Sequence, residues 1–390
     1  MSKIPKVILL IERSRSFGQG LLCGINQYSN LHGPWLFYME PEFYRQAKKN
    51  PKKWFKGLNA DGVMAHTWDP DLIETLINLD IPAVIHGPME KPIRRAYPLL
   101  TDEAGTGRMA VEYFIERGFR NFAYCGFDII WSQQKGDGFK QRLAEAGFQA
   151  YIYHQPAAKN LRKPAKEQII IANWLTPLPK PLALMACNDD RAVDVLAACK
   201  IANFKVPEDV AILGVDNDKL LCNFSYPKLS SIVLGTERAG YAAAKVLDKV
   251  MKGGKISKNE REVAILPLNV VTRQSTDTVA IEDKVVAEAV SFIRRNSRKL
   301  IQVGDVAQAV DLSRRALEQH FRRALNRSIH EEIKYARVNQ MADMLIGTNL
   351  SVSQITKLLG YTYATSYIYR YFKQLKGMSP IDYRKKFAPK

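Results

Sequence analysis

The chain has 390 residues, of which 46% are hydrophobic and 25% are charged, as in an ordinary soluble globular protein of two or three domains. Its formal net charge of +18 favours a polyanionic partner. No apolar run reaches the length of a membrane span, and Lys3–Ile11 is too short for a signal peptide. Membrane-spanning and secreted proteins are therefore excluded, and a cytoplasmic location is expected.

Strand and helix patterns alternate along residues 7–215. The apolar run Val7–Ile11 predicts a buried parallel strand, and Phe17–Tyr28 has the spacing of a helix. A second round of alternation begins near Thr101. The other predicted strands lie at 35–38, 61–65, 81–85, 121–125, 149–153, 181–187 and 210–215, and the other helices at 72–79, 105–117, 136–146, 165–175 and 190–200. Two such rounds predict an α/β fold of two doubly wound lobes with parallel sheets.

The chain is expected to cross between these lobes near Thr101, Ile232 and Ile265. The polar run Arg273–Glu282 has the composition of a linker. The domains assigned in this way are a sensor at 1–276, with lobes of roughly 1–101 plus 236–262 and 102–233 plus 263–276, a linker at 277–284 and an all-α domain at 285–390.

The C-terminal domain contains a first helix-turn-helix pattern. Val303–Val310 has apolar residues at helical spacing, and Ser313 is a good N-cap for a second helix over Arg314–Leu325. Leu317 and Phe321 recur four residues apart and mark the buried stripe of that helix. A short helix, a tight turn and a helix with an exposed Arg/Gln face is the arrangement that enters a DNA major groove.

The pattern then repeats. Ser351 and Gln354 have the spacing of a capping box, Gly360 supplies the turn, and Ser366–Leu375 is a second candidate recognition helix. Between the two units, Ile329–Ile346 has apolar residues in helical register and predicts a rigid spacer. The two units are expected to contact two segments of one DNA face, about one helical turn apart.

Charge supports this interpretation of the C-terminal domain. Residues 281–390 hold 20 lysines and arginines against 10 acidic residues, whereas residues 1–280 hold 37 against 29. The density of net charge is therefore about threefold higher in the C-terminal part, as expected where a nucleic acid binds. The alternative is that these basic residues are only solvated surface charges.

The C-terminal hundred residues resemble the AraC/XylS family of transcription regulators. The resemblance rests on several spaced motifs: Ser366–Lys373, Gly377–Pro380, Tyr383-Arg384, Leu312-Ser313, Leu317 and Phe321-Arg322. It departs from the family at Thr362–Thr365, a turn one residue longer than usual, and at Gln319, where relatives often have arginine. The resemblance implies two DNA-binding units and no catalytic residue.

The exposed faces of the recognition helices supply the candidate DNA contacts. We expect Arg314, Arg315 and Gln319 to contact base edges in the first unit. The corresponding candidates in the second unit are Thr362, Tyr363 and Thr365. The remaining candidates, among which the arginines and the lysine are expected to contact phosphates, are Glu318, Arg322, Tyr369, Arg370 and Lys373.

Residues 6–276 are similar to the sugar-binding domain of LacI/GalR-type repressors, which has a periplasmic-binding-protein-like fold. The motifs that carry the similarity are Thr101–Gly107, Arg117–Phe119, Cys187–Asp190, Val206–Asp216 and Tyr226–Ser231. The N-terminal helix-turn-helix of that family is absent, so DNA binding is expected at the C-terminus instead. A LacI-type sensor joined to an AraC-type tail resembles the xylose-operon activators, which implies D-xylose as the effector.

Asp189 and Asp216 each follow a predicted strand at its carboxyl end, where open α/β sheets bind ligands. A carboxylate at that edge accepts strong charge-assisted hydrogen bonds from sugar hydroxyls. The similar family contacts its effector at the matching positions. The alternative is structural: Asp189 then caps the helix predicted to start at Asp190, and Asp216 caps a loop.

Five further residues are weaker candidates for effector binding. Lys135 falls where many relatives have an effector-binding arginine, and the alternative is a solvated helix face. Trp131 is suited to stack on a sugar ring, although a core or hinge tryptophan explains it almost equally well. Ser14, Ser16 and Phe17 follow the first strand and either line the first lobe's ligand face or form a plain loop.

One motif suggests an enzyme. Gly105–Ala110 matches the dinucleotide pattern G-x-G-x-x-A, and Asp128 lies about twenty residues on. We reject it because Pro98 makes the preceding segment a poor central strand and Asp102-Glu103 places negative charge where a pyrophosphate would lie. The six histidines are scattered. His66 and His86 follow strands and either line the ligand cleft or, as we favour, are satisfied structural histidines.

The five cysteines are widely spaced and odd in number: Cys23, Cys125, Cys187, Cys199 and Cys222. No pair has the spacing of metal ligands, so they are interpreted as buried thiols in a reducing compartment. No cofactor and no metal site are expected.

The sequence therefore predicts a cytoplasmic, sugar-responsive transcription regulator that binds operator or promoter DNA. We expect an activator and a homodimer, with RNA polymerase as a further partner and no membrane contact. Sugar binding is expected to close the lobes and so change the geometry of the DNA-binding units. The alternatives are a regulator that responds to another sugar or to a nucleobase, a ligand-binding module whose basic tail binds DNA nonspecifically, and a sugar or nucleotide oxidoreductase.

Overall fold

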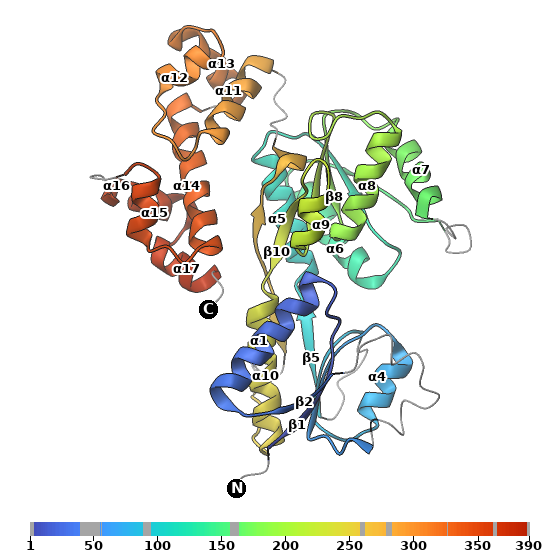
Figure 1. Ribbon diagram of the computed structural model, residues 1–390. Helices are drawn as coiled ribbons and strands as arrows, with labels where there is room; N and C mark the ends of the chain where they lie inside the picture. The colour runs from blue at the N-terminus through green and yellow to red at the C-terminus, as the bar shows by residue number, and fades with distance from the viewer. Residues whose placement is uncertain are drawn as a thin grey trace. The chain divides into compact units, whose positions relative to one another are not determined.

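The computed structural model describes residues 4–39, 55, 57–88, 95–156, 164–257, 262–277, 283–325, 327–361 and 365–387 (Figure 1). It has two separate six-stranded sheets followed by a domain built only of helices, which confirms the predicted fold class. The chain divides into two compact units, Met1–Asp102 with Leu234–Pro267 and Glu103–Val233 with Leu268–Lys390. None of the helices in the described ranges is long and apolar enough to cross a membrane.

The first sheet has the strand order β11-β5-β4-β3-β1-β2, and each of its neighbouring strands is parallel. Its central strands are fully buried, because helices cover both faces. The strands are β1 (Lys6–Leu10), β2 (Leu36–Met39), β3 (Gly62–His66), β4 (Ala83–His86), β5 (Ala96–Thr101) and β11 (Val263–Ile265), and the helices are α1 (Ser16–His32), α4 (Pro70–Ile77) and α10 (Thr236–Met251).

Helices α1 and α10 lie side by side although they are about 200 residues apart in the chain (Figure 1). Glycines make this close approach possible. A Cβ added to Gly24 would lie 1.9 Å from the Glu237 carbonyl oxygen, and one added to Gly240 would lie 2.2 Å from that of Leu21. The buried Tyr28 hydroxyl also donates to Asp248 at 2.9 Å.

The second sheet has the order β12-β10-β9-β8-β6-β7. The four pairings from β10 to β7 are parallel, so the carboxyl ends of these strands lie at one edge. The strands are β6 (Asn121–Cys125), β7 (Ala150–Ile152), β8 (Leu182–Ala186), β9 (Val210–Val215), β10 (Ser230–Leu234) and β12 (Pro267–Val271), and the helices are α5 (Glu103–Ile115), α6 (Ile130–Glu145), α7 (Pro164–Leu175), α8 (Asp189–Ile201) and α9 (Lys219–Phe224).

Two predictions for these lobes were wrong. Residues 96–101 form an internal strand despite Pro98, which lies opposite Ile85 in the parallel pairing of β4 and β5. Helix α6 starts at Ile130 rather than Gly136, so Trp131 and Lys135 lie on a helix. Gly138 lies where α6 packs closely against α5. A Cβ at this position would lie 2.4 Å from the Ala104 Cα, so glycine allows the two helices to approach each other.

The first residues of the polar run Arg273–Glu282 belong to the second lobe rather than to a linker. The Arg273 guanidinium donates to the Leu229 carbonyl and the Asn217 side chain at 2.8 Å, and Ser275 and Thr276 are fully buried. The polar side chains of Arg273, Ser275 and Thr276 are therefore used for hydrogen bonds within the second lobe, where Gln274–Thr276 form one turn of 3-10 helix.

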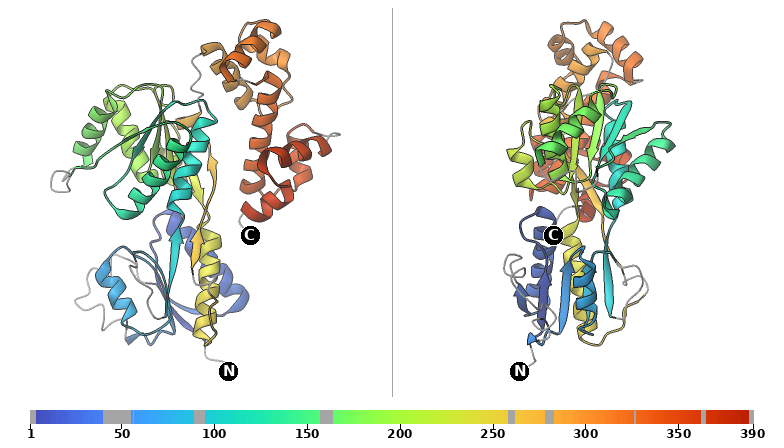
Figure 2. Two further views of the ribbon diagram at one scale, coloured as in Figure 1. Left: turned by 180° about the vertical axis from the view of Figure 1, so that it is seen from behind. Right: turned by 90° about the vertical axis from the view of Figure 1, so that its right-hand side faces the viewer.

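The C-terminal domain contains both predicted helix-turn-helix units. Helix α14 runs as one long helix from the first group of helices to the second in every view (Figures 1 and 2). Val286, Phe321 and Ile333 belong to the core of the first group, and Val338 and Phe372 belong to that of the second. The helices are α11 (Lys284–Arg295), α12 (Val303–Ala309), α13 (Arg314–Leu325), α14 (Ile329–Gly347), α15 (Val352–Leu358), α16 (Thr365–Lys376) and α17 (Pro380–Phe387).

Candidate functional site

Asp189 is a buried carboxylate at the carboxyl edge of the second sheet, directly after β8. Only 1% of its surface is exposed. One of its oxygens accepts a hydrogen bond from the Ser231 hydroxyl at 2.6 Å, and the other accepts from the Asp218 backbone N–H at 2.7 Å. Burial raises the pKa of Asp189, and the nearby Asp216 charge raises it further. The side chain thus fastens the loop after β9 to α8.

The alternative capping role predicted for Asp189 is wrong by one residue. Helix α8 begins at Asp189 itself, and its N-cap is Asn188, whose side chain accepts from the Arg191 N–H at 2.9 Å. The loop after β9 is likewise capped by a different residue, because Asp218 accepts from the first N–H groups of α9.

Asp216 is the other carboxylate at this edge, directly after β9. Its backbone has φ +95°, a conformation that side chains rarely adopt and that concentrates at functional sites. The half-buried carboxylate has no hydrogen-bond partner among the residues that the structure describes. Burial raises its pKa to about 6, and the nearby Lys135 charge partly opposes that rise. Asp216 is therefore held in place by its backbone while its oxygens stay available.

Lys135 is 3% exposed, so the predicted alternative of a solvated helix face is wrong. Its ammonium donates to the Cys187 carbonyl at 2.7 Å and pairs with Glu103 at 3.2 Å. Burial alone would lower its pKa, but the carboxylates of Glu103 and Asp216 raise it above the ordinary value. The lysine is charged and links two acceptors, the Cys187 carbonyl after β8 and the Glu103 carboxylate of α5.

Trp131 stands one helical turn before Lys135 on α6, with the ammonium 5.0 Å from the centre of its ring. It is half-buried and also meets the Phe127 ring at a centroid distance of 6.2 Å. An apolar ring therefore lies beside the charged groups of Lys135, Glu103 and Asp216. Carboxylates, an ammonium and an aromatic face together suit a neutral polyhydroxylated ligand such as a sugar.

Glu103 was missed as a site residue. In the sequence, its negative charge speaks only against a bound pyrophosphate. The structure makes the same charge one half of the ion pair with Lys135, where its side chain is 11% exposed. The signal available in the sequence was its place directly after the first crossing of the chain between lobes.

The first lobe has its own cluster at the carboxyl ends of β1, β3 and β4. Phe17 is half-buried, and its ring centre lies 4.9 Å from that of His66 and 5.1 Å from that of His86. Burial lowers the pKa of His66 to about 4, so the imidazole is neutral near pH 7. Its buried Nδ1 has no hydrogen-bond partner within the described part of the chain. His66 is therefore not fully satisfied by the described residues, which favours the alternative that it lines the ligand face.

The two serines predicted beside Phe17 differ in exposure. Ser14 is exposed and its hydroxyl donates to Glu12, a local contact within the loop after β1. Ser16 is half-buried and is the first residue of α1. Neither observation tests their predicted contact with an effector.

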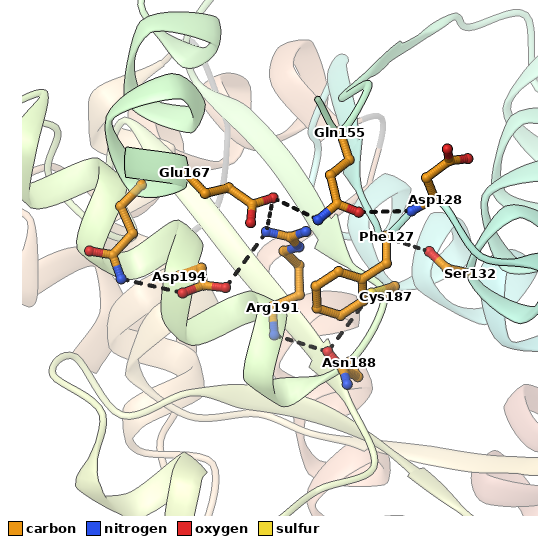
Figure 3. Close-up of polar contacts among 10 residues, drawn as sticks. Phe127, Asp128, Ser132, Gln155, Glu167, Cys187, Asn188, Arg191 and Asp194 are labelled. Atoms are coloured by element: carbon orange, nitrogen blue, oxygen red, sulfur yellow. Dashed lines mark hydrogen bonds and ion pairs between the residues drawn. The ribbon is translucent and has the colours of Figure 1, made fainter. Parts of the chain in front are cut away.

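A network of polar contacts around the buried Arg191 joins segments that follow β6, β7 and β8 (Figure 3). Arg191 is completely buried, pairs with Glu167 at 2.8 Å and Asp194 at 3.6 Å, and places its guanidinium 4.0 Å from the Phe127 ring centre. Gln155 donates to Glu167 and accepts from the Asp128 N–H, which extends the network to the loop after β6. This network holds Phe127, the ring that Trp131 contacts.

The first recognition helix, α13, presents the predicted basic face. Arg314, Arg315, Gln319 and Arg322 are exposed, whereas Leu317 and Phe321 are fully buried. Glu318 is half-buried and accepts from the Ile329 N–H at 3.4 Å, so it faces the start of α14. A helix with an apolar inner stripe and three exposed arginines fits the major groove.

The second recognition helix, α16, exposes Arg370 and Lys373. Tyr369 is half-buried, and burial raises its pKa. The predicted contacts Thr362 and Tyr363 lie outside the described residues, and for Thr365 only the backbone, at the start of α16, is described. The structure therefore shows that Arg370 and Lys373, the residues expected to contact phosphates, are exposed. The contacts expected between this unit and DNA bases remain predictions.

Comparisons with known proteins agree with this two-part architecture. Residues 111–276 match the periplasmic binding protein-like domain family, and residues 306–386 match a helix-turn-helix domain family. The xylose operon regulatory protein of Haemophilus influenzae is 30% identical over 97% of this chain and 98% of its own length. The chain belongs to the family of xylose operon regulatory proteins. The Escherichia coli K12 protein of that name is 28% identical over 98% of this chain and 97% of its own.

Solved structures give the same assignment. The xylose-binding transcription activator xylR matches with a TM-score of 0.62 at 26% identity and covers 100% of both chains. The cellobiose complex of the regulator CelR shares only the sensor fold, with a TM-score of 0.56 at 19% identity over 69% of this chain and 84% of its own. The chain is thus a sugar-responsive, sequence-specific DNA-binding transcription regulator, as predicted.

Proposed function

We propose that D-xylose is the effector and that the carboxyl edge of the second sheet binds it. The observation that carries this proposal is the Asp216 carboxylate, which is held by a left-handed backbone without a hydrogen-bond partner of its own in the described chain. The charged Lys135 and the Trp131 ring lie at the same edge. The names of the full-length relatives supply the identity of the sugar.

In this proposal the two carboxylates have different roles. Asp216 accepts hydrogen bonds from sugar hydroxyls, Lys135 donates to a sugar oxygen, and Trp131 covers the apolar face of the ring. Asp189 stays fully bonded within the protein and positions the loop that carries Asp216. Phe17 and His66 offer a second apolar and polar surface in the first lobe, and Ser14 and Ser16 are further candidates there.

Titration calorimetry tests the effector directly. D-xylose is titrated into the full-length protein beside L-arabinose, D-ribose, D-glucose and adenine. Binding of D-xylose that is weakened in Asp216→Asn and unchanged in Asp137→Asn supports the proposal, because Asp137 is an exposed carboxylate of the same lobe. Preferential binding of another sugar or of adenine would replace D-xylose as the effector.

We also propose that the chain activates transcription as a homodimer in the cytoplasm and acts together with RNA polymerase. Its role is regulatory, with no catalytic step. Sugar binding shifts the sensor between two states, and the DNA-binding units bind operator DNA better in one of them. An operator fragment in excess random DNA tests specificity, since a nonspecific basic tail would show no preference between them.

A further inference from the structure

Two recognition helices on one domain must keep a fixed spacing and rotation relative to each other if they are to bind one DNA site together. Their hydrophobic cores are separate, one around Phe321 and one around Phe372. Helix α14 packs against both, but a helix alone leaves each unit free to rock about it. A second connection between the units, beside α14, would remove this freedom.

Such a connection exists between the loop before α12 and the turn of the second unit. Gly360, in that turn, has φ +84°, and a Cβ added to it would lie 2.4 Å from the Leu300 Cγ. Leu300 belongs to the first unit's loop and is 64% exposed, so it does not belong to either core. It lies directly on the backbone of the second unit's turn.

Arg337, near the middle of α14, contacts residues on both sides of this connection and is 8% exposed. One guanidinium nitrogen, Nη2, donates to the carbonyls of Lys299 and Ile301 at 3.0 and 3.2 Å. The other, Nη1, donates to the Tyr361 hydroxyl at 3.3 Å. A single side chain thus holds the residues on both sides of Leu300 and the residue after Gly360.

The chemistry of this group argues for a positioning role. Arg337 has no carboxylate partner among the ion pairs of the described residues, so its buried charge is balanced only by neutral acceptors. Such a charge is costly to bury and is poorly explained by stability alone. The planar guanidinium bonds acceptors in two directions at once, which the single ammonium of a lysine does not reproduce.

We propose that Arg337, Tyr361 and Leu300 form a joint that fixes the spacing and rotation between the two recognition helices. The joint makes the chain specific for the distance between the two DNA segments, separately from the bases within each. Insertion of one base pair between the segments displaces them by about 3.4 Å and rotates them by about 35°. A rigid joint resists this change, whereas a loosened joint follows it.

The test compares two DNA duplexes. One is a duplex selected by the full-length protein from random sequences, and the other is the same duplex with one base pair inserted between the two contacted segments. We expect the insertion to weaken wild-type binding by about tenfold or more, because one helix loses its base contacts. In Tyr361→Phe and in Leu300→Ala the same insertion should weaken binding by less than about threefold.

Tyr371→Phe is the matched control, since it removes the same hydroxyl from the second unit without touching Arg337. It should keep the wild-type penalty for the insertion. Circular dichroism and the melting temperature show that each variant is folded. Folded joint variants that keep the full penalty overturn the proposal. So do variants that lose binding to both duplexes by the same factor, because the joint would then serve affinity and not spacing.

Discussion

The proposed sugar site and the first recognition helix of this chain use charge in opposite ways. At the sensor edge, Lys135 and Glu103 are largely removed from water. Lys135 and Asp216 shift each other's pKa values, and the Glu103 charge raises both. On α13, Arg314, Arg315 and Arg322 are exposed. Buried charges recognise a neutral ligand through short directional bonds, whereas exposed charges attract a polyanion from a distance and respond to salt. Variants at these residues test the contrast.

The largest effect is expected from Lys135→Met. The substitution keeps the apolar stem but leaves the carboxylates of Glu103 and Asp216 without their cation, which costs about 3–5 kcal/mol of unfolding free energy. Denaturant unfolding of the full-length protein measures this loss. Lys140→Met is the control, since Lys140 is half-exposed and its ion pair with Asp137 contributes about 0–1 kcal/mol. Equal stability of the two variants would contradict the buried network.

Asp216→Asn is expected to have the next largest effect, on sugar affinity. Replacement of a carboxylate acceptor by an amide removes charge-assisted bonds, each of which contributes about 1.5–3 kcal/mol. The dissociation constant for D-xylose should rise about tenfold to a hundredfold, as measured by calorimetry. Unchanged affinity in this variant would move the binding site away from the end of β9.

In the DNA-binding domain, Arg315→Ala should relax sequence preference by about 1–3 kcal/mol. Arg322→Ala should instead weaken binding to all sequences and reduce the salt dependence by about one phosphate contact. Competition between operator and random DNA at several salt concentrations separates the two effects. An unchanged ratio of operator to random affinity in Arg315→Ala would rule out its contact with a base.

The smallest effect is a pH dependence of sugar affinity. The Asp216 pKa is about 6, so about nine tenths of the carboxylate is ionised at pH 7 and about one tenth at pH 5. Affinity for D-xylose should fall about tenfold between these values and follow the protonation of this group. The contribution of Asp216 to the folding stability of the sugar-free sensor changes with pH in the opposite direction. The raised pKa favours the folded state below pH 3.8, and this contribution is lost as pH rises through about 6. A flat affinity profile in calorimetry would contradict the assignment.

The same contrast explains which features the sequence predicts. The helix-turn-helix units follow from local signals, and the capping box of Ser351 and Gln354 is present as predicted. The sensor edge depends on tertiary contacts instead. The sequence pattern predicted this helix only from Gly136, whereas α6 starts at Ile130 and so includes Lys135, Gly136 and Gly138. Those glycines are tolerated because α5 and the Tyr124 ring approach them closely, which only the folded arrangement shows.

Polar contacts between residues far apart in the sequence could not be predicted either. Arg191 follows Asp189 in a segment whose pattern predicts only a helix, yet it is completely buried against Glu167, which is 24 residues earlier. Pro98 argued against a central strand, yet β5 is internal and pairs in parallel with both β4 and β11. Residue type and spacing alone do not reveal partners brought together by chain crossings.

The central claim is that sugar binding in the sensor changes DNA binding at the other end of the chain. The most direct test is the affinity of the full-length protein for operator DNA with and without D-xylose, for wild type and Asp216→Asn. We expect D-xylose to tighten wild-type binding and to leave the variant unchanged, with equal affinities of the two proteins in the absence of sugar. Equal operator affinity with and without a sugar that calorimetry shows to be bound would contradict the coupling.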